Sequence, residues 1–152
     1  MKKKSMKHAA VIRALALLVL FTITFNACKT KGSGETEPTE QELALEKLGG
    51  TWSLANGGSI LVDGSDHSVS YTGFTATLAE GTYNTTNAGE LFESSGTWIW
   101  LGESSTSFSL DDGKTITITD LTESRLVISF THTGSGGIAN GVAGAYVVTL
   151  TK

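Results

Sequence analysis

After residue 49 the chain alternates apolar and hydroxyl-bearing side chains with a period of two. In the run 115–119, Ile116 and Ile118 alternate with three threonines, and residues 125–132 and 143–151 follow the same pattern. Because successive side chains of a strand point to opposite faces, this period predicts half-buried antiparallel strands with one apolar and one polar face.

Short glycine-containing turns, such as 63–65 and 111–113, separate these runs, and the chain has only one proline. Short turns join sequential strands as hairpins, which favours an up-and-down barrel over a Greek-key sandwich, and closure removes exposed sheet edges. We therefore predict an all-β domain at 39–152, an antiparallel up-and-down β-barrel of about eight strands. The expected segments, some of them minor, are 51–55, 59–62, 68–78 (which Gly73 can interrupt), 81–86, 96–101, 106–110, 114–119, 125–132 and 143–151.

A short α-helix is predicted immediately before the first strand. Thr39 and Glu42 have the spacing of a capping box, and Gly49 is a candidate left-handed terminator. A helix of about nine residues is too short to be stable alone. It must therefore dock its apolar face on the barrel, through Ala44, Leu45 and Leu48.

Residues 1–27 are predicted to be a secretory signal peptide. Residues 1–8 are basic, and 14–25 form a mostly apolar run of about a dozen residues, too short to cross a bilayer of roughly 30 Å as a helix. The end of the run, with Ala27 before Cys28, resembles the lipobox of bacterial lipoproteins. Phe25 and Asn26 depart from the usual pattern.

Cys28 is the only cysteine, so no intramolecular disulfide is possible. The lipobox resemblance implies that Cys28 is lipidated and anchors the protein to a membrane, and several acyl chains make such an anchor lasting. Residues 28–38 are polar and are predicted to be a flexible tether. Lys29 after the cysteine resembles the sorting pattern for the outer rather than the inner membrane, with the periplasmic or surface face left open.

Charge is distributed unevenly along the chain. Five of the eleven lysines and arginines precede residue 14, whereas all fifteen acidic residues lie at or after Glu35. Without the signal peptide, six bases face fifteen acids, a net charge of −9. Since nucleic-acid affinity comes largely from phosphate neutralisation, we expect no nucleic-acid partner.

A short helix followed by Gly50-Thr51-Trp52 on the first strand resembles the lipocalin and wider calycin pattern. Together with the lipobox, a second Gly-Thr-Trp at 96–98 and the Asp-Gly turns, the whole chain is similar to lipocalin-like lipoproteins of Bacteroidetes. The resemblance implies a barrel closing over an internal cavity. It also implies a basic side chain that covers Trp52, with Arg125 as the first candidate and Lys152 as the second.

Aromatic residues are the main candidates for a binding site. Trp98 and Trp100 lie two positions apart, so they share one face of a strand. Two readings stay open, because an eight-stranded barrel either fills with side chains or holds one small ligand. The candidate ligand-binding residues are Trp98, Trp100, Phe108, Phe130, His132 and Tyr146, with the last two supplying polar groups.

No catalytic group, metal site or cofactor is predicted. Cys28 is blocked if it is lipidated, and no His, Cys or acidic cluster has zinc-ligand spacing. We therefore expect a non-enzymatic protein, either binding a small apolar ligand in the barrel or acting as an envelope module that binds glycan or protein. The second reading uses outward-facing aromatic residues, for example Tyr71, Phe74 or Tyr83. The oligomeric state is left open.

Overall fold

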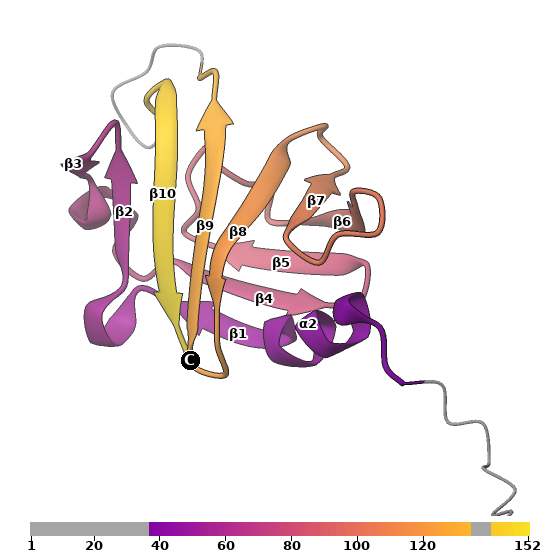
Figure 1. Cartoon of the computed structure of the whole chain (residues 1–152). Coiled ribbons are helices and arrows are strands. Elements are labelled where there is room, and N and C mark those ends of the chain that lie inside the picture. The colour runs from indigo at the N-terminus through magenta and orange to yellow at the C-terminus, as the bar shows by residue number, and fades with distance from the viewer. Residues whose placement is uncertain (1–36, 135–140) are drawn as a thin grey trace, which may run out of the picture. The chain divides into compact units, whose positions relative to one another are not determined.

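The computed structural model describes residues 37–134 and 141–152. The predicted signal peptide at 1–27, the lipidation site Cys28 and most of the predicted tether at 28–38 lie outside the described residues. The part from Pro38 to Lys152 forms one unit. Figure 1 shows it as a strongly bent sheet with one short helix against it.

Helix α2 (Glu40–Leu48) precedes the described strands, and two short 3-10 helices interrupt them, η1 (Ala55–Gly57) and η2 (Ser68–Tyr71). The strands are β1 (Gly50–Ser53), β2 (Ser59–Val62), β3 (Ser65–Asp66), β4 (Thr75–Ala79), β5 (Thr82–Thr86), β6 (Ser95–Trp100), β7 (Ser107–Leu110), β8 (Thr115–Leu121), β9 (Arg125–His132) and β10 (Gly144–Thr151).

The predicted barrel is confirmed as a closed, eight-stranded antiparallel barrel. Strands β4 to β10 pair with their sequence neighbours, β1 pairs with β4, and the Ser53–Thr151 pair between β1 and β10 closes the ring. Strand β2 pairs with β10 beyond that point, and β3 extends β2. The chain between β1 and β2 bends at Asn56, whose φ is 53°. Strands β1 and β2 therefore lie one after the other along β10.

The segment predicted at 68–78, which Gly73 can interrupt, is divided there. Its first part is η2, and β4 begins only at Thr75. Gly73 lies between them with a φ of 77°, a conformation that does not continue a strand. The interruption turns Tyr71 and Phe74 into the core, where both are buried.

Side chains from the inner face of the strands, from helix α2 and from the connections form one apolar core, with Leu48, Trp52, Leu126, Val148 and Leu150 among its most buried members. Within residues 37–134 and 141–152, the buried core residues lie between positions 48 and 150.

The predicted capping box of the helix is confirmed. Thr39 N–H donates to Glu42 Oε2 at 2.7 Å, and Glu42 N–H donates to Thr39 Oγ1 at 3.2 Å. The predicted left-handed terminator at Gly49 is wrong, because Gly49 is extended, with a φ of −59°. Gly50, with a φ of 119°, takes the positive-φ position and directs the chain straight into β1.

The second Gly-Thr-Trp has its own local reason. A Cβ atom at Gly96 would lie 2.6 Å from ring atoms of Tyr83 on the neighbouring strand β5. Glycine is therefore required where the Tyr83 ring crosses β6.

Candidate functional site

The end of the barrel under helix α2, which we call the closed end, is built around Trp52. Trp52 is fully buried, and its indole N–H donates to Leu48 O at 2.8 Å. Lys152 Nζ lies 4.2 Å from the centre of the Trp52 ring and donates to Lys47 O and Gly49 O at 2.6 and 2.7 Å. The last carbonyls of a helix lack hydrogen-bond donors within the helix, and here Trp52 and Lys152 are their donors.

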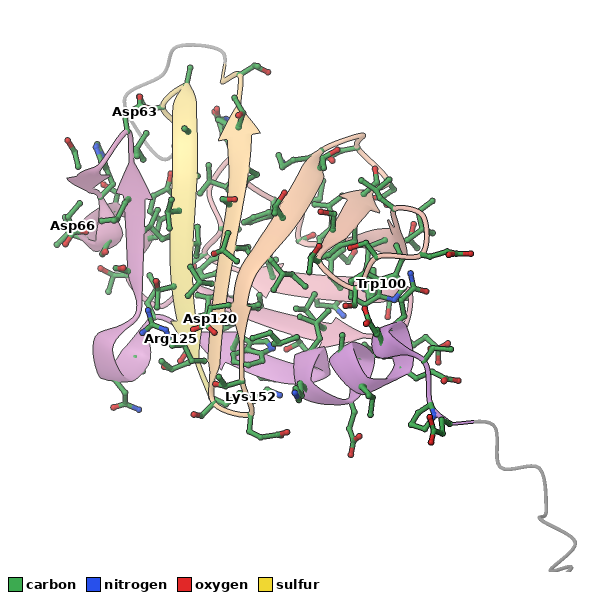
Figure 2. The ribbon with its side chains drawn as sticks, viewed as in Figure 1. Asp63, Asp66, Trp100, Asp120, Arg125 and Lys152 are labelled. Atoms are coloured by element: carbon green, nitrogen blue, oxygen red, sulfur yellow. The ribbon has the colours of Figure 1, made fainter. Side chains whose placement is uncertain are left out.

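Arg125 is not the side chain that covers Trp52. It pairs with Asp120 at 3.2 Å, and both side chains are about half exposed. Figure 2 shows this pair apart from Lys152, which lies at the lower end of the barrel beside α2. Gly50 leaves the room for Lys152, since a Cβ there would lie 3.2 Å from Lys152 Cε.

Trp98, Trp100 and Phe108 pack against one another. Their ring centres are 5.0 to 6.0 Å apart. The indole N–H of Trp98 donates to Ala79 O and Thr82 O. Trp98 and Phe108 are buried, and Trp100 is partly buried. This half of the predicted ligand site is therefore a packed aromatic cluster that holds the turn between β4 and β5.

Phe130, His132 and Tyr146 form the other half, at the opposite end of the barrel, where β9 ends and β10 begins. We call this the open end. Phe130 and Tyr146 stack with ring centres 5.1 Å apart, and His132 meets the edge of Tyr146 at 6.0 Å. The Tyr146 hydroxyl donates to Val142 O at 2.7 Å. The structure therefore divides the six predicted residues between two places.

The barrel interior holds a small hollow of about 40 Å³. Apolar side chains line nearly all of it, among them Phe74, Phe92, Phe108 and Ile128. A water molecule needs about 10–15 Å³ of such volume, and ligand pockets span roughly 300–1,000 Å³. In this conformation the interior is mostly filled core with one apolar void.

The connection between β5 and β6, residues 87–94, covers the interior at the open end, and we call it the lid. Figure 1 shows it rising behind β9 and β8. Leu91 is fully buried, and the Phe92 ring packs 6.2 Å from Phe74 and 5.1 Å from Phe130. Phe92 thus closes the hollow from above.

Lys114 connects the lid to the barrel. Its Nζ donates to Leu91 O and pairs with Asp112 Oδ2 at 3.0 Å. It also lies 5.1 Å from the Phe92 ring centre and 5.9 Å from that of Phe130. Only 13% of the Lys114 side chain is exposed. The Lys114 ammonium group therefore connects the lid to the rim of the barrel.

A groove of about 820 Å³ also opens at this end. Threonine and serine side chains from β8 and β9 line it, together with Glu90, Asp112 and His132. His132 Nε2 is buried and has no hydrogen-bond partner among residues 37–134 and 141–152. A buried polar atom without a partner costs about 1–3 kcal/mol, so it marks a place where a further group would be stabilising.

Carboxylates dominate the rim of the open end. Burial opposes ionisation of Asp112, but the hydrogen bonds and the charge of Lys114, together with the electrostatic effect of His132, outweigh it, so the pKa of Asp112 is lowered. Burial, aided by Asp111 and Asp112, raises the pKa of Tyr83 to about 12. These groups make the rim a poor place for an anion.

Sequence reasoning missed Phe92, Lys114 and the lid. The only available signal was the isolated Lys114 within an acidic half of the chain, directly after the turn at 111–113. The suggestion that outward-facing aromatic residues bind a partner fails for its named examples, because all three are at most 3% exposed: Tyr71, Phe74 and Tyr83.

Within 37–134 and 141–152, no three His, Cys, Asp or Glu side chains are grouped to hold a metal ion. No helix in the same residues is long and apolar enough to cross a bilayer. Comparison with models of protein families, with curated proteins and with solved structures finds no match to this chain.

Proposed function

We propose that this chain is a non-enzymatic, lipid-anchored protein of the bacterial outer membrane whose barrel binds a small apolar molecule. The anchor is Cys28, at the end of the predicted signal peptide. The resemblance to lipocalin-like lipoproteins supports the same role.

The observation that carries this proposal is the apolar hollow inside a closed barrel. A void of about 40 Å³ costs roughly 1 kcal/mol at about 24 cal/mol per Å³, and a binding function gives a reason for keeping it. Because a ligand needs more volume than this, part of the present filling must move when it binds.

Ligand binding is tested with the chain from Lys29 onward, which contains every core residue that the structure describes. Ala76 on β4 lines the hollow, so Ala76→Leu fills it and is expected to abolish saturable binding of N-phenyl-1-naphthylamine, followed by fluorescence. Ala79→Leu, on the exposed face of the same strand, is the matched control and should bind normally. Equal binding by both variants would place the dye outside the hollow.

Native mass spectrometry of the mature protein taken from its own membranes identifies the natural occupant. We expect an additional mass that is lost on extraction with organic solvent. The acyl mass on Cys28 is measured in the same spectrum, and Cys28→Ser should release the protein into the soluble fraction or leave it unprocessed. A mature protein without an acyl mass would contradict the anchor.

The groove at the open end favours a second candidate, an envelope module that binds glycan. Its hydroxyl groups, the Glu90 and Asp112 carboxylates and the unpartnered His132 Nε2 are suited to hydrogen-bonding a polyhydroxylated ligand. Glu90→Gln is expected to weaken binding to an array of bacterial glycans. Glu123→Gln, in the turn between β8 and β9, is the control.

A further inference from the structure

The lid differs from the other connections of the barrel because it supplies core side chains. Ala88 and Leu91 are buried in the core cluster, and Phe92 packs against it. These side chains fill the upper part of the interior directly above the hollow. Moving the lid would therefore enlarge the hollow without breaking a strand pair of the barrel.

The backbone at the start of the lid has the conformation of a tight turn. Asn87 and Gly89 have φ values of 53° and 61°. The Asn87 side chain donates to Thr72 O and Gly73 O at 3.4 and 3.3 Å. The start of the lid is thus attached to the loop before β4, while Leu91 and Phe92 lie further along the segment.

The last two residues of the lid are tied to β5, because Thr85 N–H donates to Ser94 O at 2.9 Å and Thr85 Oγ1 donates to Glu93 O at 2.8 Å. Two contacts hold the part of the lid before them shut. The first is Lys114, whose Nζ donates to Leu91 O while it pairs with Asp112. The second is Gly141 before β10, where a Cβ atom would lie 2.8 Å from Glu90 Cβ. The first contact is polar, and the second joins buried Gly141 to exposed Glu90. Neither contact belongs to the hydrogen-bonded strand ladder, and segments outside such a ladder open locally at lower free energy than core strands.

We propose that residues 87–94 are a movable lid, latched by Lys114, and that its opening admits a small, uncharged, apolar molecule into the space held by Leu91 and Phe92. This inference rests on the proposed ligand-binding function and adds the route and the ligand class. The ligand is uncharged because the hollow is apolar and the rim above it carries Glu90 and Asp112.

A reversible cross-link tests the lid. In the chain from Lys29 onward, Glu90→Cys with Gly141→Cys introduces two cysteines and no others. Their Cβ atoms would start 2.8 Å apart, about 1 Å closer than the roughly 3.8 Å of a disulfide, so the two segments must move apart by that amount when the cross-link forms. Oxidation should slow association of N-phenyl-1-naphthylamine at least tenfold or abolish binding, and reduction should restore it. Glu90→Cys alone, at an exposed position and with the same oxidant, is the control, and near-ultraviolet circular dichroism reports whether the oxidised form keeps its packing.

The latch and the ligand class are tested with two further measurements. Lys114→Met keeps the apolar stem but removes the donor to Leu91 O, so the dye should associate several-fold faster. Lys47→Met, on the exposed side of α2, is the control and should not change the rate.

The ligand class is tested with a charged dye. The sulfonated analogue of the dye, 1-anilinonaphthalene-8-sulfonate, has the same rings with a negative charge. It should bind at least tenfold more weakly, and an equal affinity would contradict the uncharged class.

The outcomes separate the lid from the function on which it rests. Equal association rates in the oxidised and reduced forms overturn the lid and leave ligand binding intact. Phe92→Ala removes a lid side chain that fills the interior. If this variant binds the dye and the wild type does not, the lid proposal is also overturned, because the lid of the wild type then does not open. No binding by either protein contradicts the proposed function itself.

Discussion

The two ends of the barrel differ in how completely their buried polar groups are hydrogen-bonded. At the closed end, Trp52 and Lys152 donate to the final carbonyls of helix α2. At the open end, His132 Nε2 has no partner in the described part of the chain, and one lysine connects the lid, the rim and two aromatic rings. The closed end is built for stability, whereas the open end keeps unsatisfied and easily broken contacts, which is where binding and motion are expected.

The largest effect is expected from Trp52→Ala at the closed end. Truncating a buried tryptophan costs about 3–5 kcal/mol, a large part of the roughly 5–15 kcal/mol that stabilise a domain. The free energy of unfolding in urea should fall by this amount, and Trp100→Ala, at a partly buried position, should cost less. A smaller loss for Trp52→Ala than for Trp100→Ala would reverse the assignment of the closed end.

Lys152→Met should have the next largest effect. It removes two charge-assisted hydrogen bonds and a cation–π contact at an exposed site, together worth about 1–2 kcal/mol. Arg125→Met removes only an exposed ion pair, worth about 0–1 kcal/mol. Urea unfolding of both variants compares the two candidate covers of Trp52, and an Arg125 effect above that of Lys152 would contradict the structure.

At the open end, His132→Leu is expected to be neutral or stabilising, by up to about 1 kcal/mol. The change replaces an unpartnered buried nitrogen with an apolar group of similar size. Thermal unfolding measures it. A clear fall in melting temperature would mean that His132 contributes to stability as the closed-end residues do.

The smallest expected effect is the pH dependence of stability that comes from Asp112. The pKa of Asp112 is lower in the folded protein than its ordinary value of about 3.9, so its stabilising contribution is present above that pH and is lost as the pH falls through the lower, folded value. The difference in unfolding free energy between wild type and Asp112→Asn should therefore shrink below about pH 4. A difference that stays constant from pH 6 to pH 2 would show that Lys114 does not depend on this carboxylate.

Local patterns predicted the elements of the fold well. The period of two located nearly every strand, and Thr39 with Glu42 located the start of the helix, because both signals depend on residues a few positions apart. The helix end was less predictable. Gly49 and Gly50 are adjacent, and which of them takes the positive φ is decided by the direction in which β1 must leave.

The candidate site was predictable only in part. The prediction that Trp98 and Trp100 lie on the same face of a strand is confirmed. A common face does not show whether a ring contacts a ligand or packs against its neighbours. Phe130, His132 and Tyr146 come together because β9 and β10 pair in register, with Phe130 opposite Tyr146.

By itself, the sequence determined an acidic, antiparallel all-β domain preceded by a short helix, since alternation, turn residues and capping act over a few residues. Only the tertiary structure decided that Lys152 rather than Arg125 covers Trp52, and that Lys114 holds Leu91. These contacts join residues 100 and 23 positions apart, and barrel closure and register, rather than any local preference, bring them together.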